Sequence, residues 1–360
     1  MSEPNIGNTL GEALDLDDAR KRYHFALAPE DYDRLPFYTA LLRELESDSL
    51  ALEMLASVRH EQRNPMLVLA ALHLAALTGH DVLGPIYDEA RHGSLEDCEG
   101  AARRVIDVIR SNPDIVRGQL WRSTQTNEPG RSAVIQAVVR DIADDLDEIN
   151  LIEVGASAGI NLHFDKFPVR TADDGHPLTL VCEDLSPVDR SGVMPRVRTR
   201  IGIDPQPLDL DNEADRLWLK ACLWPEQRRR HERLDAIVDA RPSWPHATML
   251  RGSAMECIED AFSLIDNDVM TIVMNTWSAF YFTPSERIAY FEEIDRRCAK
   301  GNVAWISMES TMVKWPDVEV DEAAHHRAAS QVILMRPSSA PVVWGWCHAH
   351  GRWLERTTDS

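Results

Sequence analysis

Basic charge, paired cysteines and long apolar runs are all scarce in this sequence. Its 38 Lys and Arg residues stand against 59 Asp and Glu residues, which gives a formal net charge of −21. Such a field repels polyphosphates and leaves no broad basic surface, so no nucleic-acid partner is expected. The six cysteines include no C-x-x-C pair, which argues against a zinc knuckle and a disulfide framework. We therefore expect reduced thiols that mostly fill small core positions.

No segment has the length and apolarity of a membrane span. The longest apolar stretch, residues 65–79, is shorter than the roughly 20 residues needed to cross a bilayer, and it contains His73. It predicts a buried helix, and no membrane association is expected. The opening MSEPNIGNTLGEALDLDDAR is polar and acidic and lacks a charged-then-apolar leader. The expected location is cytoplasmic, and no feature of the sequence indicates an oligomeric state.

The first 147 residues carry a helical pattern. With 360 residues, 44% of them hydrophobic, the chain suits one large domain or two modest ones. Apolar residues recur at spacings of three and four in the segments 35–45, 49–58, 65–77, 96–109 and 131–146. This pattern predicts a helical N-terminal region, or cap, over residues 1–124.

From Asn150 onward, short β-rich runs alternate with helical ones. The predicted strands are NLIEVG and residues 199–204, 247–252, 269–275 and 303–309. The predicted helices are residues 158–166, 211–240, 254–264 and 284–299. Nearly continuous apolar strands separated by helices predict a parallel sheet covered on both faces. The expected fold over residues 125–360 is therefore α/β, with a Rossmann-like, mostly parallel sheet.

Two features are expected to interrupt the parallel sheet. Residues 331–336 and 341–347 are joined by PSSA, which is too short for a parallel crossover. A terminal antiparallel pair is therefore predicted. A hairpin within residues 167–183 is expected to separate the first helix from the second strand.

The segment LIEVGASAGINL, residues 151–162, predicts a strand, a glycine turn and a helix that bind a nucleotide-type cofactor. Small residues let the backbone approach a ligand, and free N–H groups at a helix start favour an anionic or polar group. Glu153 lies at the carboxyl end of the strand, where open α/β sheets place their ligands. The predicted cofactor contacts are Glu153, Gly155, Ala156, Ser157, Ala158, Gly159 and Asn161.

Three functions compete for this turn. The dinucleotide fingerprint G-x-G-x-x-G fails at Ser157 and Ile160. The hydrolase motif G-x-S-x-G fits, with Ser157 as nucleophile and His348 or His350 as base. The helical pattern upstream, which has no His-Gly pair for an oxyanion loop, argues against it. The third candidate is a class I S-adenosylmethionine-dependent methyltransferase, because Glu153 and the small residues after it resemble the first motif of that class.

The methyltransferase resemblance implies contacts at both ends of the cofactor. The turn would cradle the amino-acid end, and an acid closing the second strand would hold the ribose hydroxyls. Asp204, in RIGIDPQPLD, resembles that acid, since a cis-diol matches two carboxylate oxygens. The inserted hairpin would explain its long separation from Glu153, and Glu183 and Asp184 are the fallback.

Four motifs in order bring the resemblance closer to one family. They are QTNEPGRSAVI, LIEVGASAGINLHFDKF, RIGIDPQPLD and WLKACLWPEQRRRHERL. Together they resemble the bacterial family catalogued as domain of unknown function 2332, over nearly the whole chain. The resemblance implies a methyltransferase-type fold with no settled substrate. At the third strand, Gly252-Ser253-Ala254 stands where Gly-Asp-Ala is expected. The resemblance places Ser253 and Ala254 as the predicted contacts at the adenine end.

Polar residues also precede the helix that leads into the first strand. In methyltransferase-like folds this region covers the cofactor, so Asn127, Glu128 and Arg131 are predicted contacts. Arg131 would clamp the methionine carboxylate with two hydrogen bonds. The alternative is a capping network, with Thr126 or Asn127 as the N-cap of the helix.

The candidate reacting groups follow the fourth and fifth strands. Asn275 would accept a hydrogen bond from a nucleophile's N–H, and Trp277 or Tyr281 would face a sulfonium. Thr276 would line the same site, and Glu309 is a candidate base. The alternative for the aromatic residues is simple packing. The alternative for Glu309 is a structural carboxylate with a hydrogen-bonded partner. His348 and His350 lack a third ligand, so no metal is expected.

The sequence thus predicts an enzyme that binds S-adenosylmethionine and methylates a small molecule or a protein. A non-catalytic cofactor-binding scaffold is the contrasting alternative, and a serine hydrolase that uses Ser157 is the third.

Overall fold

The computed structural model describes residues 15–26, 34–58, 62–143, 146–186, 193–318 and 330–357. Its chain divides into two compact units. The first, here called the helical unit, comprises Met1–Thr126 and Leu210–Asp235, and the second, the sheet unit, comprises Asn127–Asp209 and Ala236–Ser360. Residues 210–235 thus pack with the N-terminal helices, although they follow the glycine turn in sequence.

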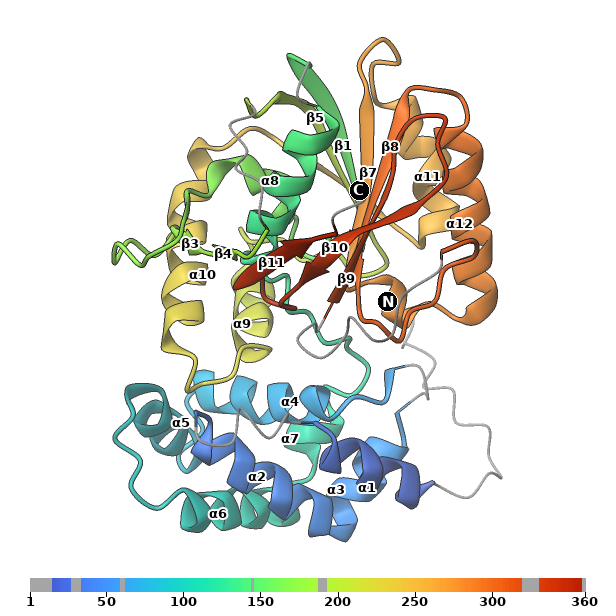
Figure 1. The fold of residues 1–360 in the computed structure, drawn as a ribbon. Helices are drawn as coiled ribbons and strands as arrows, with labels where there is room; N and C mark the ends of the chain where they lie inside the picture. Colours follow the sequence, from blue (N-terminus) through green and yellow to red (C-terminus); the bar gives the residue numbers. More distant parts are fainter. Residues whose placement is uncertain are drawn as a thin grey trace. The chain divides into compact units, whose positions relative to one another are not determined.

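The sheet unit is built on one large, mostly parallel sheet (Figure 1). Within the described residues its strand order is β4-β11-β10-β9-β8-β7-β1-β5-β6. The parallel strands are β1 (Glu148–Val154), β5 (Arg196–Asp204), β6 (Thr248–Arg251), β7 (Thr271–Thr276) and β8 (Val303–Glu309). Numbered in chain order, these strands and β9 lie across the sheet in the order 3-2-1-4-5-6, so the winding reverses between β1 and β7. The sixth strand, β9, is antiparallel to its neighbour β8. The predicted α/β class is confirmed.

The far edge of the sheet turns antiparallel. Strands β9 (Ser330–Met335) and β10 (Val342–Cys347) form the predicted antiparallel pair, and β9 is also antiparallel to β8. Two short strands, β11 (Trp353–Arg356) and β4 (Glu183–Asp184), complete this edge. They were not predicted, because runs of two to four residues carry no measurable alternation.

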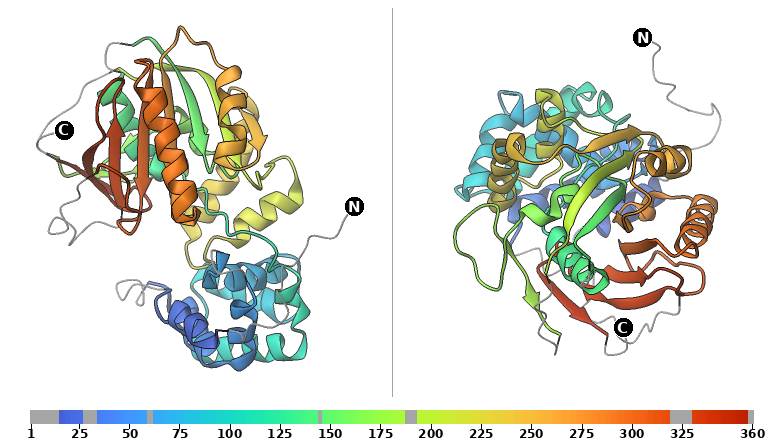
Figure 2. Two further views of the ribbon diagram at one scale, coloured as in Figure 1. Left: turned by 90° about the vertical axis from the view of Figure 1, so that its right-hand side faces the viewer. Right: turned by 90° about the horizontal axis from the view of Figure 1, so that it is seen from above.

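Helices α11 (Ala254–Ser263) and α12 (Pro284–Cys298) cover one face of the sheet, and α8 (Arg131–Ile142) covers the other (Figures 1 and 2). The core beneath α11 and α12 joins apolar side chains from the central strands to those of both helices. Its fully buried members include Ile152, Val273, Tyr290, Ile294 and Trp305. This packing leaves the carboxyl ends of β1 and β7 side by side.

Three predicted elements differ in the structure. The helix predicted at 158–166 is a 3-10 helix, η3 (Asn161–Lys166), and the predicted hairpin at 167–183 is a short parallel pair, β2 (Val169–Arg170) with β3 (Leu180–Val181). The helix predicted at 211–240 is two helices, α9 (Glu213–Ala221) and α10 (Arg228–Ala240). Pro225 lies in the break between them, because the residue before a proline avoids helical backbone angles.

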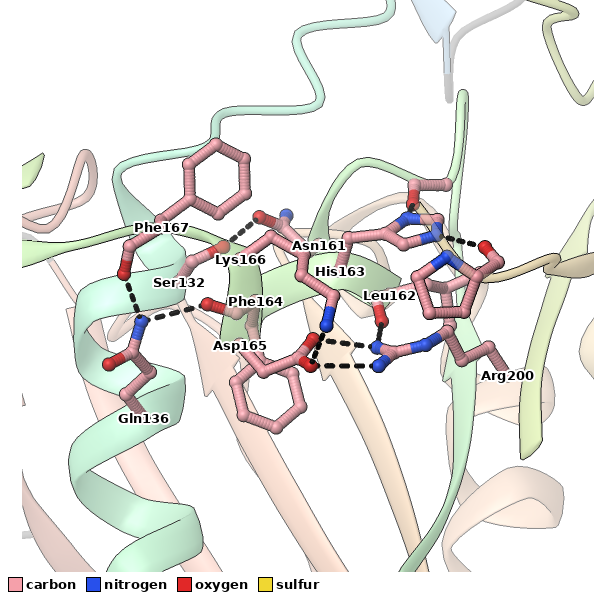
Figure 3. A network of polar contacts seen from close by, with 12 residues as sticks. Ser132, Gln136, Asn161, Leu162, His163, Phe164, Asp165, Lys166, Phe167 and Arg200 are labelled. Carbon is pink, nitrogen blue, oxygen red and sulfur yellow. Dashed lines mark hydrogen bonds and ion pairs between the residues drawn. The ribbon is translucent and has the colours of Figure 1, made fainter. Parts of the chain in front are cut away.

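Side chains from α8 and β5 bond the carbonyl groups in and just after η3 (Figure 3). Gln136 Nε2 donates to the carbonyl oxygens of Phe164 and Phe167, both at 2.8 Å. Arg200 donates to the Leu162 carbonyl and pairs with Asp165 through two bonds of 2.8 and 2.9 Å. Pro168 follows η3 and has no N–H, and Phe167 before it is extended, so the helix ends there. Burial raises the Asp165 pKa, but Arg200 and Lys166 outweigh this effect and the net shift is downward.

The helical unit packs short helices around an apolar core. The predicted segments appear as α2 (Pro36–Ser47), α3 (Ser49–Ala56), α4 (Pro65–Leu77) and α6 (Cys98–Ser111), and the structure adds α1 (Leu16–His24), α5 (Leu83–His92) and α7 (Asp114–Arg117). The expectation that the apolar stretch forms a buried helix is confirmed at α4.

Two side chains tie residues 210–235 to the N-terminal helices. His73 Nδ1, on α4, contacts the carbonyl oxygens of Ala221 at 3.1 Å and Leu223 at 2.9 Å. The Glu226 carboxylate accepts hydrogen bonds from the Phe37 and Tyr38 N–H groups, which begin α2. Since α2 has no side-chain cap of its own, Glu226 supplies the N-terminal acceptor.

The structure bears on what the sequence predicted for the cysteines and for membrane-spanning helices. All six cysteines are free and five of them are buried, which confirms their predicted place in the core. No helix in the described ranges is long and apolar enough to span a bilayer.

Candidate functional site

The site lies where the winding of the sheet reverses, between β1 and β7. Strand β1 pairs with β5 on one side and β7 on the other, so that Glu153 lies opposite Gly202 and Met274. Doubly wound sheets bind ligands in the crevice outside the carboxyl ends of strands at such a reversal. The turn after β1 and the turn after β7 both begin here.

The turn after β1 needs the small residues that the sequence places in it. Gly155, Ser157 and Gly159 have left-handed φ angles of +78°, +56° and +70°. A Cβ atom at Gly155 would lie 2.1 Å from Ser278 Cβ, so a side chain there would displace the turn after β7. Across the sheet, a Cβ at Gly202 would lie 2.8 Å from that of Ala156. Close packing therefore accounts for part of the glycine pattern.

The backbone N–H groups of this turn are bonded within the protein, against the expectation that they are free. The Gly155 and Ala156 N–H groups donate to the Ile203 carbonyl at 2.8 and 3.1 Å, and that of Gly159 donates to Ala156 at 2.7 Å. Ser157 N–H donates to Asp204 Oδ2 at 2.8 Å. The N–H groups of Ala158 and Ile160 donate to one side-chain oxygen, Asn127 Oδ1, at 3.2 and 3.0 Å. The turn is therefore not arranged as an anion cradle.

Asn127 takes a role that neither sequence interpretation anticipated. It has a φ of +29° and its side chain reaches the glycine turn, whereas the N-cap of α8 is Gly130. Glu128 Oε1 accepts from the Gly130 N–H at 3.0 Å, so it supports the start of α8. Both residues lie at the predicted place, beside the turn, and act there on the protein backbone.

Asp204 joins the turn to the end of β5. Besides accepting from Ser157, its carboxylate accepts from the Gln206 N–H at 2.8 Å, and the residue is 7% exposed. The carboxylate thus bonds the backbone of both the glycine turn and the segment after β5. The fallback residues Glu183 and Asp184 lie on β4 at the opposite edge of the sheet, away from Glu153.

Glu153 is fully buried, and neither of its carboxylate oxygens makes a hydrogen bond within the described residues. Burial raises its pKa well above the usual range. Arg131, Asn161 and Thr276 lie near enough to oppose that shift in part, and Asp204 adds to it. Within the described residues, Ser157 Oγ and Asn161 Nδ2 are also buried and make no hydrogen bond. A buried polar group of this kind needs a ligand or water to complete it.

The Arg131 side chain hydrogen-bonds two backbone segments of the sheet unit. Its Nε donates to the Ala349 carbonyl at 3.1 Å and its Nη1 donates to the Thr276 carbonyl at 3.0 Å. These bonds connect α8 to the end of β7 and to the turn between β10 and β11. The guanidinium carbon also lies 5.8 Å from the centre of the Trp277 ring. This geometry favours a structural role over the predicted clamp on a methionine carboxylate.

Glu309 and Asn275 form a saturated pair at the ends of β8 and β7. Glu309 Oε1 accepts from Asn275 Nδ2 at 2.8 Å and from the Ser278 and Ala279 N–H groups at 3.0 Å, and Oε2 accepts from Phe280 at 3.3 Å. The remaining bonds of Asn275 join it to Ser307, Tyr290 and Trp305. Burial raises the Glu309 pKa, against these hydrogen bonds. Because both side chains are already hydrogen-bonded within the protein, the structure argues against Glu309 as a base and against Asn275 as an acceptor for a substrate.

The other predicted reacting groups are brought to the same edge. Thr276 is buried and close to Glu153, whereas Trp277 is half-buried with a left-handed φ of +54°. Trp277 Nε1 donates to Ser330 Oγ at 2.8 Å, which fixes its ring. Tyr281 is exposed in the short 3-10 helix η5 (Ala279–Tyr281). Of this group, Thr276 is the residue whose side chain lies beside Glu153.

The adenine-end contacts have local structural roles. Ser253 is the N-cap of α11 and forms a capping box with Glu256. Ala254 is buried in the core under α11 and α12. Neither placement supplies the side-chain contact that the resemblance implies.

Ser278 and His163 were missed by the sequence interpretation. Ser278 Oγ donates to the Val154 carbonyl at 2.8 Å and so links the two turns. His163 lies between the carbonyl oxygens of Gly159 and Pro245, at 3.2 and 2.9 Å. Burial lowers its pKa. A lone serine or histidine beside a motif gives no signal of such contacts, because they depend on residues that are distant in sequence.

The two late histidines form a local turn. His350 N–H donates to His348 Nδ1 at 2.9 Å, between β10 and β11. Among the residues that the structure describes, no group of three His, Cys, Asp or Glu side chains is placed to hold a metal ion.

The fold and site define an α/β protein with a doubly wound sheet and a small-residue turn at the reversal point. The chain belongs to the family described as an uncharacterized protein conserved in bacteria, domain of unknown function 2332, whose family model matches residues 21–356. The family predicted from the four motifs is thereby confirmed. No curated protein and no solved structure matches the chain.

Proposed function

We propose that the sheet unit binds S-adenosylmethionine at the turn after β1 and methylates a small molecule or a protein. One observation carries the proposal. The N–H groups of the turn are bonded within the protein, while carboxyl groups of Glu153 and Asp204 lie beside it. A ligand that suits this setting brings positive charge and hydroxyl donors.

The same observation disfavours a pyrophosphate ligand. Dinucleotide sites receive the pyrophosphate on free N–H groups at a helix start. Here Asp204 and Asn127 occupy the N–H groups of Ser157, Ala158 and Ile160. A phosphate would also meet two carboxyl groups. The cofactor of a methyltransferase has no phosphate. Its sulfonium and ammonium groups outweigh its one carboxylate, so its net charge is positive and complementary to the two carboxyl groups.

Residues of the turn divide between the two ends of such a cofactor. Asp204 would accept hydrogen bonds from the ribose hydroxyls. Glu153, Ser157 and Asn161 would complete their unused hydrogen bonds at the amino-acid end. When bound, the cofactor supplies an activated methyl group. The protein would contribute orientation and exclusion of water, which is sufficient for in-line transfer to a positioned nucleophile.

The serine hydrolase alternative has less support. The N–H after an elbow nucleophile normally helps to form the oxyanion hole, but the Ala158 N–H donates to Asn127. Ser157 Oγ has no hydrogen-bonded histidine among the described residues, and His163 contacts two backbone carbonyls instead. A serine-directed phosphonate probe should therefore leave Ser157 unlabelled, and labelling that Ser157→Ala abolishes would restore this alternative.

The scaffold alternative rests on the engagement of Glu309 and Asn275, which leaves no evident base. It shares cofactor binding with the main proposal. Binding of the cofactor without methyl transfer to a broad panel of amines, thiols, hydroxyl compounds and proteins would favour the scaffold.

The experiment is calorimetric titration of the full chain with S-adenosylmethionine and with S-adenosylhomocysteine. Glu153→Gln replaces a carboxyl acceptor at the amino-acid end of the cofactor by an amide, so the affinity should fall about tenfold to a hundredfold. Glu183→Gln, at the far edge of the sheet, is the matched control and should bind like wild type. Folded wild-type protein that binds neither ligand would overturn the proposal.

A further inference from the structure

The turn after β7 is held in one conformation from several sides. Glu309 accepts from the N–H groups of Ser278, Ala279 and Phe280, and Trp277 N–H donates to the Met308 carbonyl at 2.9 Å. Arg287 Nη2 adds bonds to the Ala279 and Phe282 carbonyls at 3.4 and 3.3 Å. These contacts fix the backbone from which the next side chains project.

Two aromatic side chains on this fixed turn remain exposed. Phe280 and Tyr281 are 39% and 41% exposed. Their ring centres lie 5.5 Å apart at an interplanar angle of 90°, and Phe280 lies 6.2 Å from the Trp277 ring. An isolated exposed aromatic residue needs no explanation. Two adjacent rings held rigidly next to a ligand-binding reversal point form a surface suited to a ligand.

The position and aromatic character of this surface indicate the kind of ligand. The turn touches the glycine turn, because Ser278 donates to Val154 and fills the space beside Gly155. Carboxyl groups of Glu153, Asp204 and Glu309 lie at this end of the sheet, together with the guanidinium groups of Arg131 and Arg287. Aromatic ring faces attract cations, so the two exposed rings favour a ligand with positive charge.

We propose that Phe280 and Tyr281 bind the methyl-accepting substrate, and that this substrate is an organic amine, cationic in water, with an apolar body. The inference rests on the proposed methyltransferase function. In the transfer, the ammonium releases one proton to water and its nitrogen lone pair forms the new N–CH3 bond as the S–CH3 bond of the sulfonium breaks. The sulfonium becomes a neutral thioether and the methylated nitrogen carries the positive charge.

Choline and its uncharged carbon isostere are suitable probes, because they share size and shape and differ in charge. Each is titrated calorimetrically into the full chain saturated with S-adenosylhomocysteine. We expect choline to bind more tightly than the isostere. Phe280→Ala and Tyr281→Ala should each weaken choline binding about two- to fivefold, and the double variant about tenfold.

Two control variants separate this effect from a change of fold. Tyr281→Phe keeps the ring and should retain choline binding, and Met312→Ala, at a residue 68% exposed, should have no effect. Equal binding of the isostere, or unchanged choline binding in the double alanine variant, would overturn the inference. S-adenosylhomocysteine titrated into the same variants separates the two proposals. If it binds while choline does not, the substrate inference fails and the proposed function stands, and if it does not bind, the proposed function fails.

Discussion

Two fully buried glutamates at the carboxyl ends of strands in the same sheet have opposite surroundings. Glu309, at the end of β8, accepts hydrogen bonds from Asn275 and from the N–H groups of Ser278, Ala279 and Phe280. Glu153, near the end of β1, accepts none within the described residues. Burial alone therefore does not distinguish a structural carboxylate from a binding one. The hydrogen-bond partners do: they make Glu309 part of the architecture of the site, and their absence at Glu153 supports the proposal that it meets a ligand.

Substituting each glutamate by glutamine should give the largest contrast. Glu309→Gln places an amide nitrogen against backbone donors, so the free energy of unfolding should fall by about 2–3 kcal/mol. Glu153→Gln removes a charge that has no hydrogen-bonded partner, so stability should change by less than about 1 kcal/mol or rise. Urea unfolding followed by near-ultraviolet circular dichroism measures both. Equal losses in the two variants would remove the distinction.

The packing between the two turns predicts a somewhat smaller effect. Gly155→Ala introduces a methyl group at a φ of +78° and against Ser278, so it should destabilise the protein by about 2 kcal/mol. Gly79→Ala is the control, because Gly79 has a φ of +89° and a Cβ atom added there would have nothing within 4 Å. The difference between the two melting temperatures isolates the collision. If Gly155→Ala costs no more than Gly79→Ala, the turns are not coupled through this contact.

The pKa of Glu153 predicts a pH dependence of stability. Because its folded pKa is raised, the folded state binds this proton more tightly than the unfolded state, and stability falls as pH rises from the unfolded pKa, about 4.3, through the folded pKa. Wild-type protein should therefore lose stability relative to Glu153→Gln as the pH rises above the unfolded pKa. Parallel melting curves for the two proteins across that range would show that the carboxyl group is not titrating as inferred.

The smallest effect is expected in the helical unit, where hydrogen-bond partners should again decide what a buried polar group contributes to stability. The buried hydroxyls of Tyr38 and Tyr87 make no hydrogen bond in the described residues, although each lies close enough to affect the other's pKa. Tyr23 donates to the Ala51 carbonyl at 3.4 Å. Tyr23→Phe should cost about 0.5–1 kcal/mol, whereas Tyr38→Phe and Tyr87→Phe should be neutral or stabilising. Thermal melts of the three variants test this expectation. A clear loss of stability in Tyr38→Phe would show that this hydroxyl does have a hydrogen-bond partner.

Elements defined by their own sequence pattern could be predicted well. The apolar stretch of α4 and the β-rich run of β8 were predicted with the bounds that the structure has. The antiparallel pair of β9 and β10 followed from the length of one connection. In each case the information lies within the segment, as hydrophobic period or loop length.

Elements shaped by distant contacts could not be predicted from the sequence. The carbonyl groups in and just after η3 are bonded by Gln136 from α8 and Arg200 from β5, which are distant from it in sequence. The packing of residues 210–235 with the helical unit depends on His73 and Glu226.

The candidate site shows the same division. Its place at the carboxyl ends of β1 and β7 and the position of Glu153 followed from the strand pattern, whereas Asp204 came from the methyltransferase resemblance. The roles of Asn127 and Glu309 did not, because a carboxamide or carboxylate in a motif looks the same whether it meets a ligand or a backbone N–H. Only the hydrogen-bond partners separate the two.

The central claim is that the turn after β1 selects a positively charged nucleoside cofactor over one that carries a pyrophosphate. Its most direct test is competitive calorimetry on the full chain with S-adenosylmethionine and NAD. The account predicts that S-adenosylmethionine binds and that excess NAD does not displace it. Binding of NAD at this turn, with displacement of S-adenosylmethionine or in its place, would contradict the account.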